Sequence, residues 1–229
     1  MQMDIQALFL TLRLAAVTTV ILLAIALPLA WWLARSSSRV RPVVEALSAL
    51  PLLLPPTVLG FYLLVMLGPE TSVGRALIAV IGHPLAFTFS GLVVGSVLYS
   101  FPFAVQPLTA GFRAVDTAAL EDAAMLGASP MRVFGSVALP MARPALVTAA
   151  VLAFMHTVGE FGVVLMLGGN IPGATRTLSI ELFDKVNEFD YASANHTALL
   201  LMGFSFLALL AIYWKRGARS SSQSGGRLV

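Results

Sequence analysis

The sequence contains no cysteine and very little charge. The absence of cysteine from all 229 residues excludes disulfides, thiolate metal sites and a cysteine nucleophile. Charged residues make up 11% of the chain and hydrophobic residues 58%, whereas an ordinary soluble domain carries about a quarter charged residues. A chain of this composition is not built to be surrounded by water, so we expect an integral membrane protein.

Several signatures of catalysis are also missing. The phosphate loop of ATP-hydrolysing proteins ends in Gly-Lys-Ser/Thr, but the two lysines, Lys185 and Lys215, follow Asp184 and Trp214 instead. No Gly-x-Ser-x-Gly elbow is present, and the three histidines lie far apart without metal-ligand spacing. We therefore expect this chain to have no enzyme activity and to bind no cofactor itself.

Five long apolar stretches recur along the chain. A hydrocarbon layer about 30 Å thick requires about 20 residues of helix, and a helix pairs its own backbone amides, as lipid demands. The sequence thus predicts an all-α bundle with about five membrane spans, in which residues 1–219 form one membrane domain. Residues 220–229 are rich in serine and glycine, and we expect a disordered tail there. The predicted spans cover residues 8–34, 46–68, 85–110, 144–167 and 191–214.

Basic residues favour one side of the predicted bundle. If the spans alternate in direction, one side carries ten basic residues and the other carries three. Lysine and arginine concentrate on the cytoplasmic side of membrane proteins, so we predict an N-terminus outside and a C-terminus in the cytoplasm. The ten residues are Arg35, Arg39, Arg41, Arg113, Arg132, Arg143, Lys215, Arg216, Arg219 and Arg227.

The predicted cytoplasmic loop of residues 113–140 contains an unusual pattern. The stretch from Glu121 to Leu126 favours a helix, Gly127 is suited to end it in the left-handed conformation, and Ser129-Pro130 can begin a second short helix. Two short helices around a tight turn would form a compact knob that transmits motion as a lever. An ordinary amphipathic linker is the alternative that these residues leave open.

This loop resembles the EAA signature of ABC-importer permeases, in which Glu-Ala-Ala is followed by a glycine and later by Ile-x-Leu-Pro. Asp122 stands in place of the first alanine, and Val137 stands in place of isoleucine. In that family the segment is the coupling helix, which docks into a cleft of a separate cytosolic ATPase that binds ATP and Mg. The resemblance implies that the docking residues are Glu121, Asp122, Ala123, Ala124, Gly127, Ala128, Leu139 and Pro140.

Three other segments resemble the molybdate permeases of this class. They are the proline-rich stretch at residues 51–60, the sequence Gly-Glu-Phe-Gly at residues 159–162, and the loop at residues 170–177. The resemblance implies a type I ABC-importer permease in the cell inner membrane, working as a pair of identical chains by alternating access. It also implies two further partners, the ATPase and a periplasmic or extracellular molybdate-binding protein, with membrane lipid around the bundle and no nucleic acid. The sulfate permeases share part of this pattern, so tungstate, sulfate and thiosulfate remain alternative substrates.

Glu160 is an ionisable residue within an apolar span. Such a residue costs about 2.5–3.5 kcal/mol even on lenient insertion scales, so it usually faces the bundle interior or water. His156 lies one turn earlier and could pair with it. We favour an interior lock between helices, or a pathway lining, over a glutamate that reaches the outer interface. The candidate residues for this role are Pro55, Pro56, His156, Gly159, Glu160, Phe161 and Gly162.

The last outer loop is predicted to run from residue 168 to residue 190. Apolar residues at helical spacing within residues 181–189 fit either a docking surface for the binding protein or a helix that caps the bundle. Arg176 could contact an anion, but a lone arginine in a loop is more often a surface contact. The carboxylate of Glu160 would repel a divalent oxyanion. An ATP-independent channel and an intramembrane enzyme centred on His156 and Glu160 are the alternative classes of function.

Overall fold

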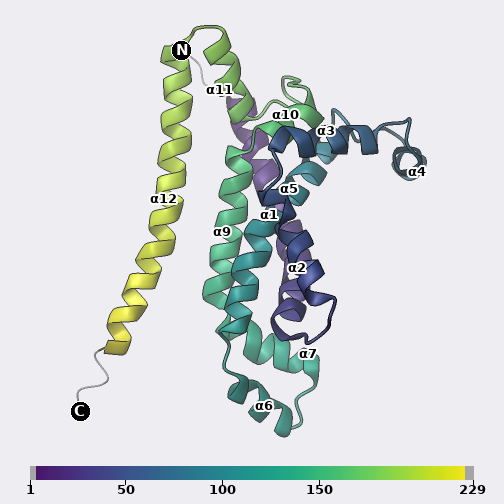
Figure 1. The fold of residues 1–229 in the computed structure, drawn as a ribbon. Coiled ribbons are helices and arrows are strands. Elements are labelled where there is room, and N and C mark those ends of the chain that lie inside the picture. The colour runs from purple at the N-terminus through teal and green to yellow at the C-terminus, as the bar shows by residue number, and fades with distance from the viewer. Residues whose placement is uncertain (1–3, 225–229) are drawn as a thin grey trace.

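The computed structural model is built from helices joined by short loops (Figure 1). It describes the backbone of residues 4–224 and the side chains of residues 4–210. Within this range the predicted all-α fold is confirmed. The elements are α1 (Ile5–Arg35), α2 (Arg41–Ala49), η1 (Leu50–Leu52), α3 (Pro56–Leu67), α4 (Ser72–Ile81), α5 (Phe89–Arg113), α6 (Thr117–Met125), α7 (Pro130–Val133), η2 (Phe134–Ala138), α8 (Leu139–Met141), α9 (Arg143–Gly159), α10 (Gly162–Gly168), α11 (Leu178–Asn187) and α12 (Tyr191–Ser224).

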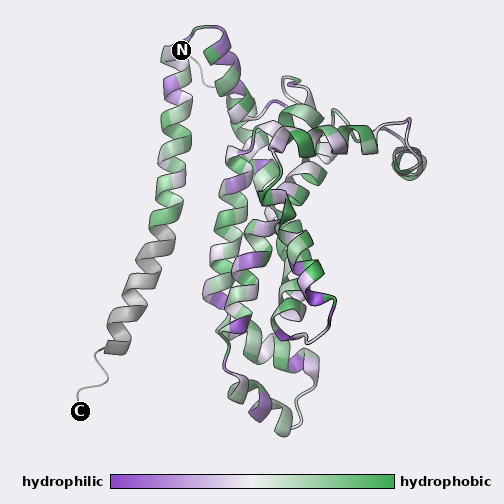
Figure 2. Ribbon diagram, viewed as in Figure 1, coloured by the Kyte–Doolittle hydropathy of each residue, from purple (hydrophilic) through white to green (hydrophobic). Residues whose placement is uncertain are grey.

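Helix α5 lies in the middle of the bundle and packs against both α1 and α9 (Figure 1). Helix α10 packs against α3 and α5, and α12 contacts α11 and α9. The short helices α6 and α7 form the end of the molecule opposite α11 (Figure 1). Figure 2 shows hydrophobic residues along the long helices and hydrophilic residues gathered around α6 and α11. This distribution suits helices that cross an apolar layer between two polar ends.

The crossing of α1, α5 and α9 is built from small residues. A Cβ added at Gly111 of α5 would lie 2.1 Å from the Cβ of Ala145 in α9, so the two backbones approach closely. Small residues allow such approaches in membranes, where van der Waals packing drives helix association. Alanines that are 0% exposed fill the same crossing, namely Ala26, Ala30, Ala104, Ala149 and Ala153.

Within the described residues, three helices are long and apolar enough to cross a membrane. They are α1, α5 and residues 191–210 of α12. Two bent pairs raise the number to as many as five: residues 41–52 with α3, bent by 106°, and residues 130–141 with α9, bent by 74°. The second predicted span is therefore broken, because Pro55 and Pro56 lack the backbone N–H that a continuous helix requires.

Three further features differ from the sequence-based expectations. Helix α4 lies in a stretch for which no helix was predicted, and Gly82, whose φ of 88° suits glycine, follows its last residue. The fourth predicted span is interrupted between α9 and α10. Helix α12 continues to Ser224, so the tail predicted to begin at residue 220 starts as helix, whereas residues 225–229 lie outside the described part of the chain.

The substitution Gly111→Ala tests the close crossing of α5 and α9. Its methyl group would overlap the Cβ of Ala145, and overpacking of this kind costs about 1–3 kcal/mol. We expect a lower midpoint of thermal unfolding in detergent. Gly203→Ala in α12 is the matched control, because a Cβ there meets no heavy atom within 4 Å. Equal midpoints for the two variants would contradict the close crossing.

Candidate functional site

The break between α9 and α10 places a glutamate inside the protein. Helix α9 ends at Gly159 and α10 begins at Gly162. Between them Glu160 has an extended backbone, with φ −67° and ψ 132°, and only 4% of the residue is exposed. The ring of Phe161 lies 4.9 Å from that of Phe183 in α11. The glutamate therefore lies in the protein interior rather than at the outer surface.

Glu160 lines a hollow of about 450 Å³, together with residues of α3, α5 and α9. Thr57 and Tyr99 contribute further polar groups to its wall. A Cβ at Gly162 would lie 2.6 Å from the Cβ of Pro56, so the glycine lets the starts of α3 and α10 meet. Pro55 is the residue that caps α3 just before the hollow. Of the predicted lock or pathway residues, the hollow brings together Pro56, His156, Gly159, Glu160, Phe161 and Gly162.

His156 does not pair with Glu160, contrary to the prediction. Its Nδ1 is hydrogen-bonded to Oγ of Ser100 at 2.9 Å, and its ring stacks on Phe103 at 3.9 Å between centroids. The Ser100 hydroxyl also lies 3.1 Å from Oγ1 of Thr157, which completes a polar contact between α5 and α9. The prediction assumed a continuous helix, but α9 ends one residue before Glu160. Because the backbone at Glu160 is extended, the glutamate no longer lies one helical turn from His156 on the same face.

The carboxyl group of Glu160 lacks hydrogen-bond and ion-pair partners of full geometry. Neither of its oxygens has a hydrogen bond of full geometry with any described residue, and no described cation forms an ion pair with it. The Ser96 hydroxyl lies close enough to interact with the carboxylate, but it also lacks a full hydrogen bond. Burying a carboxyl group without an ion pair or a full hydrogen bond costs free energy. Glu160 therefore destabilises the fold at the hollow, which is a pattern typical of functional positions.

The loop between α5 and α9 forms the predicted helix, glycine turn and second helix. The side chain of Asp116 accepts a hydrogen bond from the Ala118 backbone at 3.0 Å and so caps α6. Gly127 ends this helix in the left-handed conformation, with φ 85°. Ser129 caps α7 through the backbone N–H of Arg132. The local structure predicted for this segment is confirmed.

The tip of this loop presents large apolar side chains that sequence reasoning missed. Met125 is 79% exposed, Leu126 is 89% exposed and Met131 is 78% exposed. Exposed apolar groups gathered in one place mark interaction surfaces. Their signal in the sequence was three large apolar residues around a turn glycine. The predicted docking residues of α6 adjoin this tip, whereas Leu139 and Pro140 are half-buried near the base of the loop.

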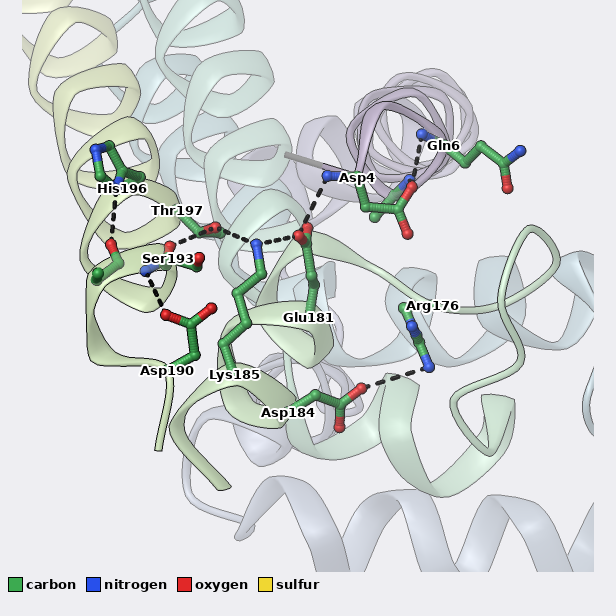
Figure 3. Close-up of polar contacts among 12 residues, drawn as sticks. Asp4, Gln6, Arg176, Glu181, Asp184, Lys185, Asp190, Ser193, His196 and Thr197 are labelled. Carbon is green, nitrogen blue, oxygen red and sulfur yellow. Dashed lines mark hydrogen bonds and ion pairs between the residues drawn. The ribbon is translucent and has the colours of Figure 1, made fainter. Parts of the chain in front are cut away.

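At the opposite end of the bundle, a buried ion pair ties α11 to its neighbours (Figure 3). Lys185 and Glu181 form this pair within α11. Glu181 also accepts a hydrogen bond from the backbone N–H of Asp4 at 3.2 Å, and Lys185 donates to Thr197 of α12 at 3.4 Å. These contacts connect α11 with the start of α1 and with α12.

Arg176 already has partners in the structure (Figure 3). Its guanidinium lies 3.6 Å from a carboxylate oxygen of Asp184. Its Nε donates to the side-chain oxygen of Asn170 at 2.8 Å. Because the guanidinium is already paired with protein groups, these contacts favour a structural role for Arg176 over binding of a free anion.

Hydrogen bonds from Ser193 to Asp190 hold the pKa of that carboxyl below its ordinary value at the start of α12.

The chain is similar to known proteins along most of its length. Residues 26–214 match the family described as binding-protein-dependent transport system inner membrane component. The molybdenum transport system permease protein ModB of Azotobacter vinelandii is 53% identical over 213 residues, which cover 93% of this chain and 94% of that protein. A putative molybdenum transport system permease protein of Bacillus subtilis, YvgM, is 33% identical and covers 90% of this chain and 91% of that protein. An inward-facing structure of the MetNI methionine ABC transporter shares the fold, with a TM-score of 0.71 at 20% identity over 95% of each chain.

Replacing each of the two buried glutamates by glutamine should shift stability in opposite directions. Glu160→Gln removes a buried carboxyl that has neither an ion pair nor a full hydrogen bond, which we expect to stabilise the protein by on the order of 1 kcal/mol. Glu181→Gln breaks a buried ion pair, and such a break costs about 3–5 kcal/mol. Thermal unfolding in detergent at neutral pH measures both effects. A loss of stability in Glu160→Gln as large as that in Glu181→Gln would show that Glu160 has a partner.

Proposed function

The chain belongs to the binding-protein-dependent transport system inner membrane components, and we propose that it is the membrane-spanning permease subunit of an ATP-driven importer for molybdate. The observation that supports molybdate as the substrate is the 53% identity to a molybdenum permease across 93% of the chain. Tungstate, sulfate and thiosulfate are the alternative substrates, because they are also divalent oxyanions.

The proposed topology has five spans in the cell inner membrane. Three long helices and two bent pairs support this number. The N-terminus lies outside, and the knob formed by α6 and α7 lies in the cytoplasm. Arginines near the knob, among them Arg35, Arg113 and Arg132, support this orientation because basic residues concentrate on the cytoplasmic side.

The knob is the proposed docking site for a separate cytosolic ATPase, which binds ATP and Mg. The exposed tip of Met125, Leu126 and Met131 supplies apolar surface that a cleft on such a partner would bury. The acidic residues Glu121 and Asp122 are exposed on α6 beside it. In this proposal the present chain hydrolyses nothing, and it changes shape when the ATPase moves the knob.

A pair of identical chains would enclose the transport pathway. One side of α3 packs on α10 through Gly60, whereas Phe61 is 49% exposed and Tyr62 is 65% exposed. This apolar surface fits a second copy related by a twofold axis. The hollow at Glu160 would then line the pathway, where a carboxylate discourages tight binding of a divalent oxyanion. Selectivity would reside in an external binding protein, which docks at the end of the bundle formed by α11.

The substrate can be tested by reconstituted transport. The chain, its ATPase and the binding protein are assembled in liposomes, and uptake of molybdate is measured with and without ATP. We expect ATP-dependent uptake of molybdate that an equal concentration of sulfate does not reduce. Strong competition by sulfate would reassign the substrate, and uptake without ATP would favour a channel.

Gly127→Val tests the knob as a coupling element. A β-branched residue in the left-handed conformation is strained by about 1–2 kcal/mol, so we expect the turn after α6 to open. Uptake of molybdate per ATP hydrolysed should fall severalfold while the protein still inserts in the membrane. Gly135→Val is the matched control in the same loop, because Gly135 has no positive φ and a Cβ there meets no heavy atom within 4 Å. Equal coupling in both variants would contradict the proposed role of the knob.

A further inference from the structure

We propose that Arg35 and Trp31, near the inner end of α1, form a rigid joint that carries the movement of the knob into the helix bundle. The joint rests on the proposed coupling to an ATPase and identifies positioning residues in α1, outside the loop of residues 113–140. It consists of two attachments to α1, one where the chain enters the knob and one where the chain leaves it.

The first attachment holds the entrance to the knob. The Nη2 atom of Arg35 donates to the carbonyl oxygens of Phe112 at 3.0 Å and Val115 at 2.9 Å. The Phe112 carbonyl lies in the last turn of α5, where helical carbonyls carry negative partial charge, and the Val115 carbonyl lies two residues beyond the helix. Val115 is 5% exposed and directly precedes Asp116, which caps α6. The guanidinium therefore fixes the start of α6 to the last turn of α1.

The second attachment holds the exit from the knob. The Trp31 ring lies 5.4 Å from the ring of Phe112 and 5.4 Å from that of Phe134, both in edge-to-face geometry. Phe134 is the first residue of η2, which follows directly after α7. The Arg35 guanidinium also lies 5.4 Å from the Trp31 ring, at a distance that permits a cation–π contact. Trp31 and Arg35 therefore join both attachments into one cluster.

Two other connections between the knob and the bundle are weaker. The chain that leaves it passes through the π-helical turn η2 and Pro140, which has no N–H to donate, and then bends by 74° into α9. Arg113 and Glu45 form an ion pair nearby, but their side chains are 40% and 47% exposed, and exposed pairs contribute little. The cluster around Trp31, in which Phe112 is fully buried and the other side chains are partly buried, thus links both ends of the knob to α1.

Arg35→Gln tests the joint in the reconstituted importer. The variant loses the guanidinium nitrogen that donates to both carbonyls, so we expect ATP hydrolysis to continue while molybdate transported per ATP falls about tenfold. Arg113→Gln is the matched control, because it removes a cation from the same last turn of α5, and that side chain pairs with Glu45 instead of taking part in the attachment. Trp31→Phe should lower the same ratio, whereas Trp32→Phe, at a residue that is 37% exposed, should not. Unchanged ratios in Arg35→Gln and Trp31→Phe would overturn the joint.

A distance measurement decides the matter even if Arg35→Gln fails to assemble. The chain has no cysteine, so spin labels can be placed at Ser37→Cys and Ser136→Cys in the otherwise native protein, diluted with unlabelled chain. A rigid joint predicts the same distance between the labels in the nucleotide-free and ATP-trapped importer. A change of several ångströms would overturn it. Failure of the wild-type chain to bind any ATPase would refute the proposed function itself, whereas normal wild-type coupling with unaffected variants would refute the joint alone.

Discussion

Every backbone amide within an apolar layer needs a partner inside the protein, and this requirement shapes the whole molecule. The helices α1 and α5 meet it by running unbroken for 31 and 25 residues. The helical backbone is interrupted at Pro55 before α3 and at Glu160 after α9. Interrupted backbone is tolerated at membrane depth only where protein or water surrounds it. The two breaks lie together, with Gly162 against Pro56, so each helps to shield the other.

The features that sequence reasoning could predict are those that depend on neighbouring residues. Composition predicted the apolar helices because span length follows from the thickness of the bilayer. The turn at Gly127 followed from local backbone preferences, and the structure shows it with φ 85°. The break at Glu160 was missed because no proline marks it and glycines at both ends fit a continuous helix as well as a broken one. The supposed pair of His156 and Glu160 failed for the same reason.

Contacts between distant residues could not be read from the pattern. Arg35 reaches carbonyls 77 and 80 residues further along the chain. A positively charged residue at the end of a span is also expected from topology alone, so nothing distinguished Arg35 from Arg39 or Arg41 in the sequence. The Ser100 contact with His156 likewise spans 56 residues. In both cases the partner is set by which helices cross, and that is decided by the packing of small residues.

Helix α5 belongs to both candidate sites, and this has a mechanical consequence. Tyr99 lines the hollow, and Phe112 belongs to the cluster at the knob. The two residues are separated by about 20 Å of helix, given a rise of about 1.5 Å per residue. Pro102 and Pro107 lie between them, and prolines are where long helices bend most readily. A force applied at Phe112 by a rigid joint would therefore bend α5 at these prolines, next to the wall of the hollow. A flexible joint would absorb the same force before it reached them.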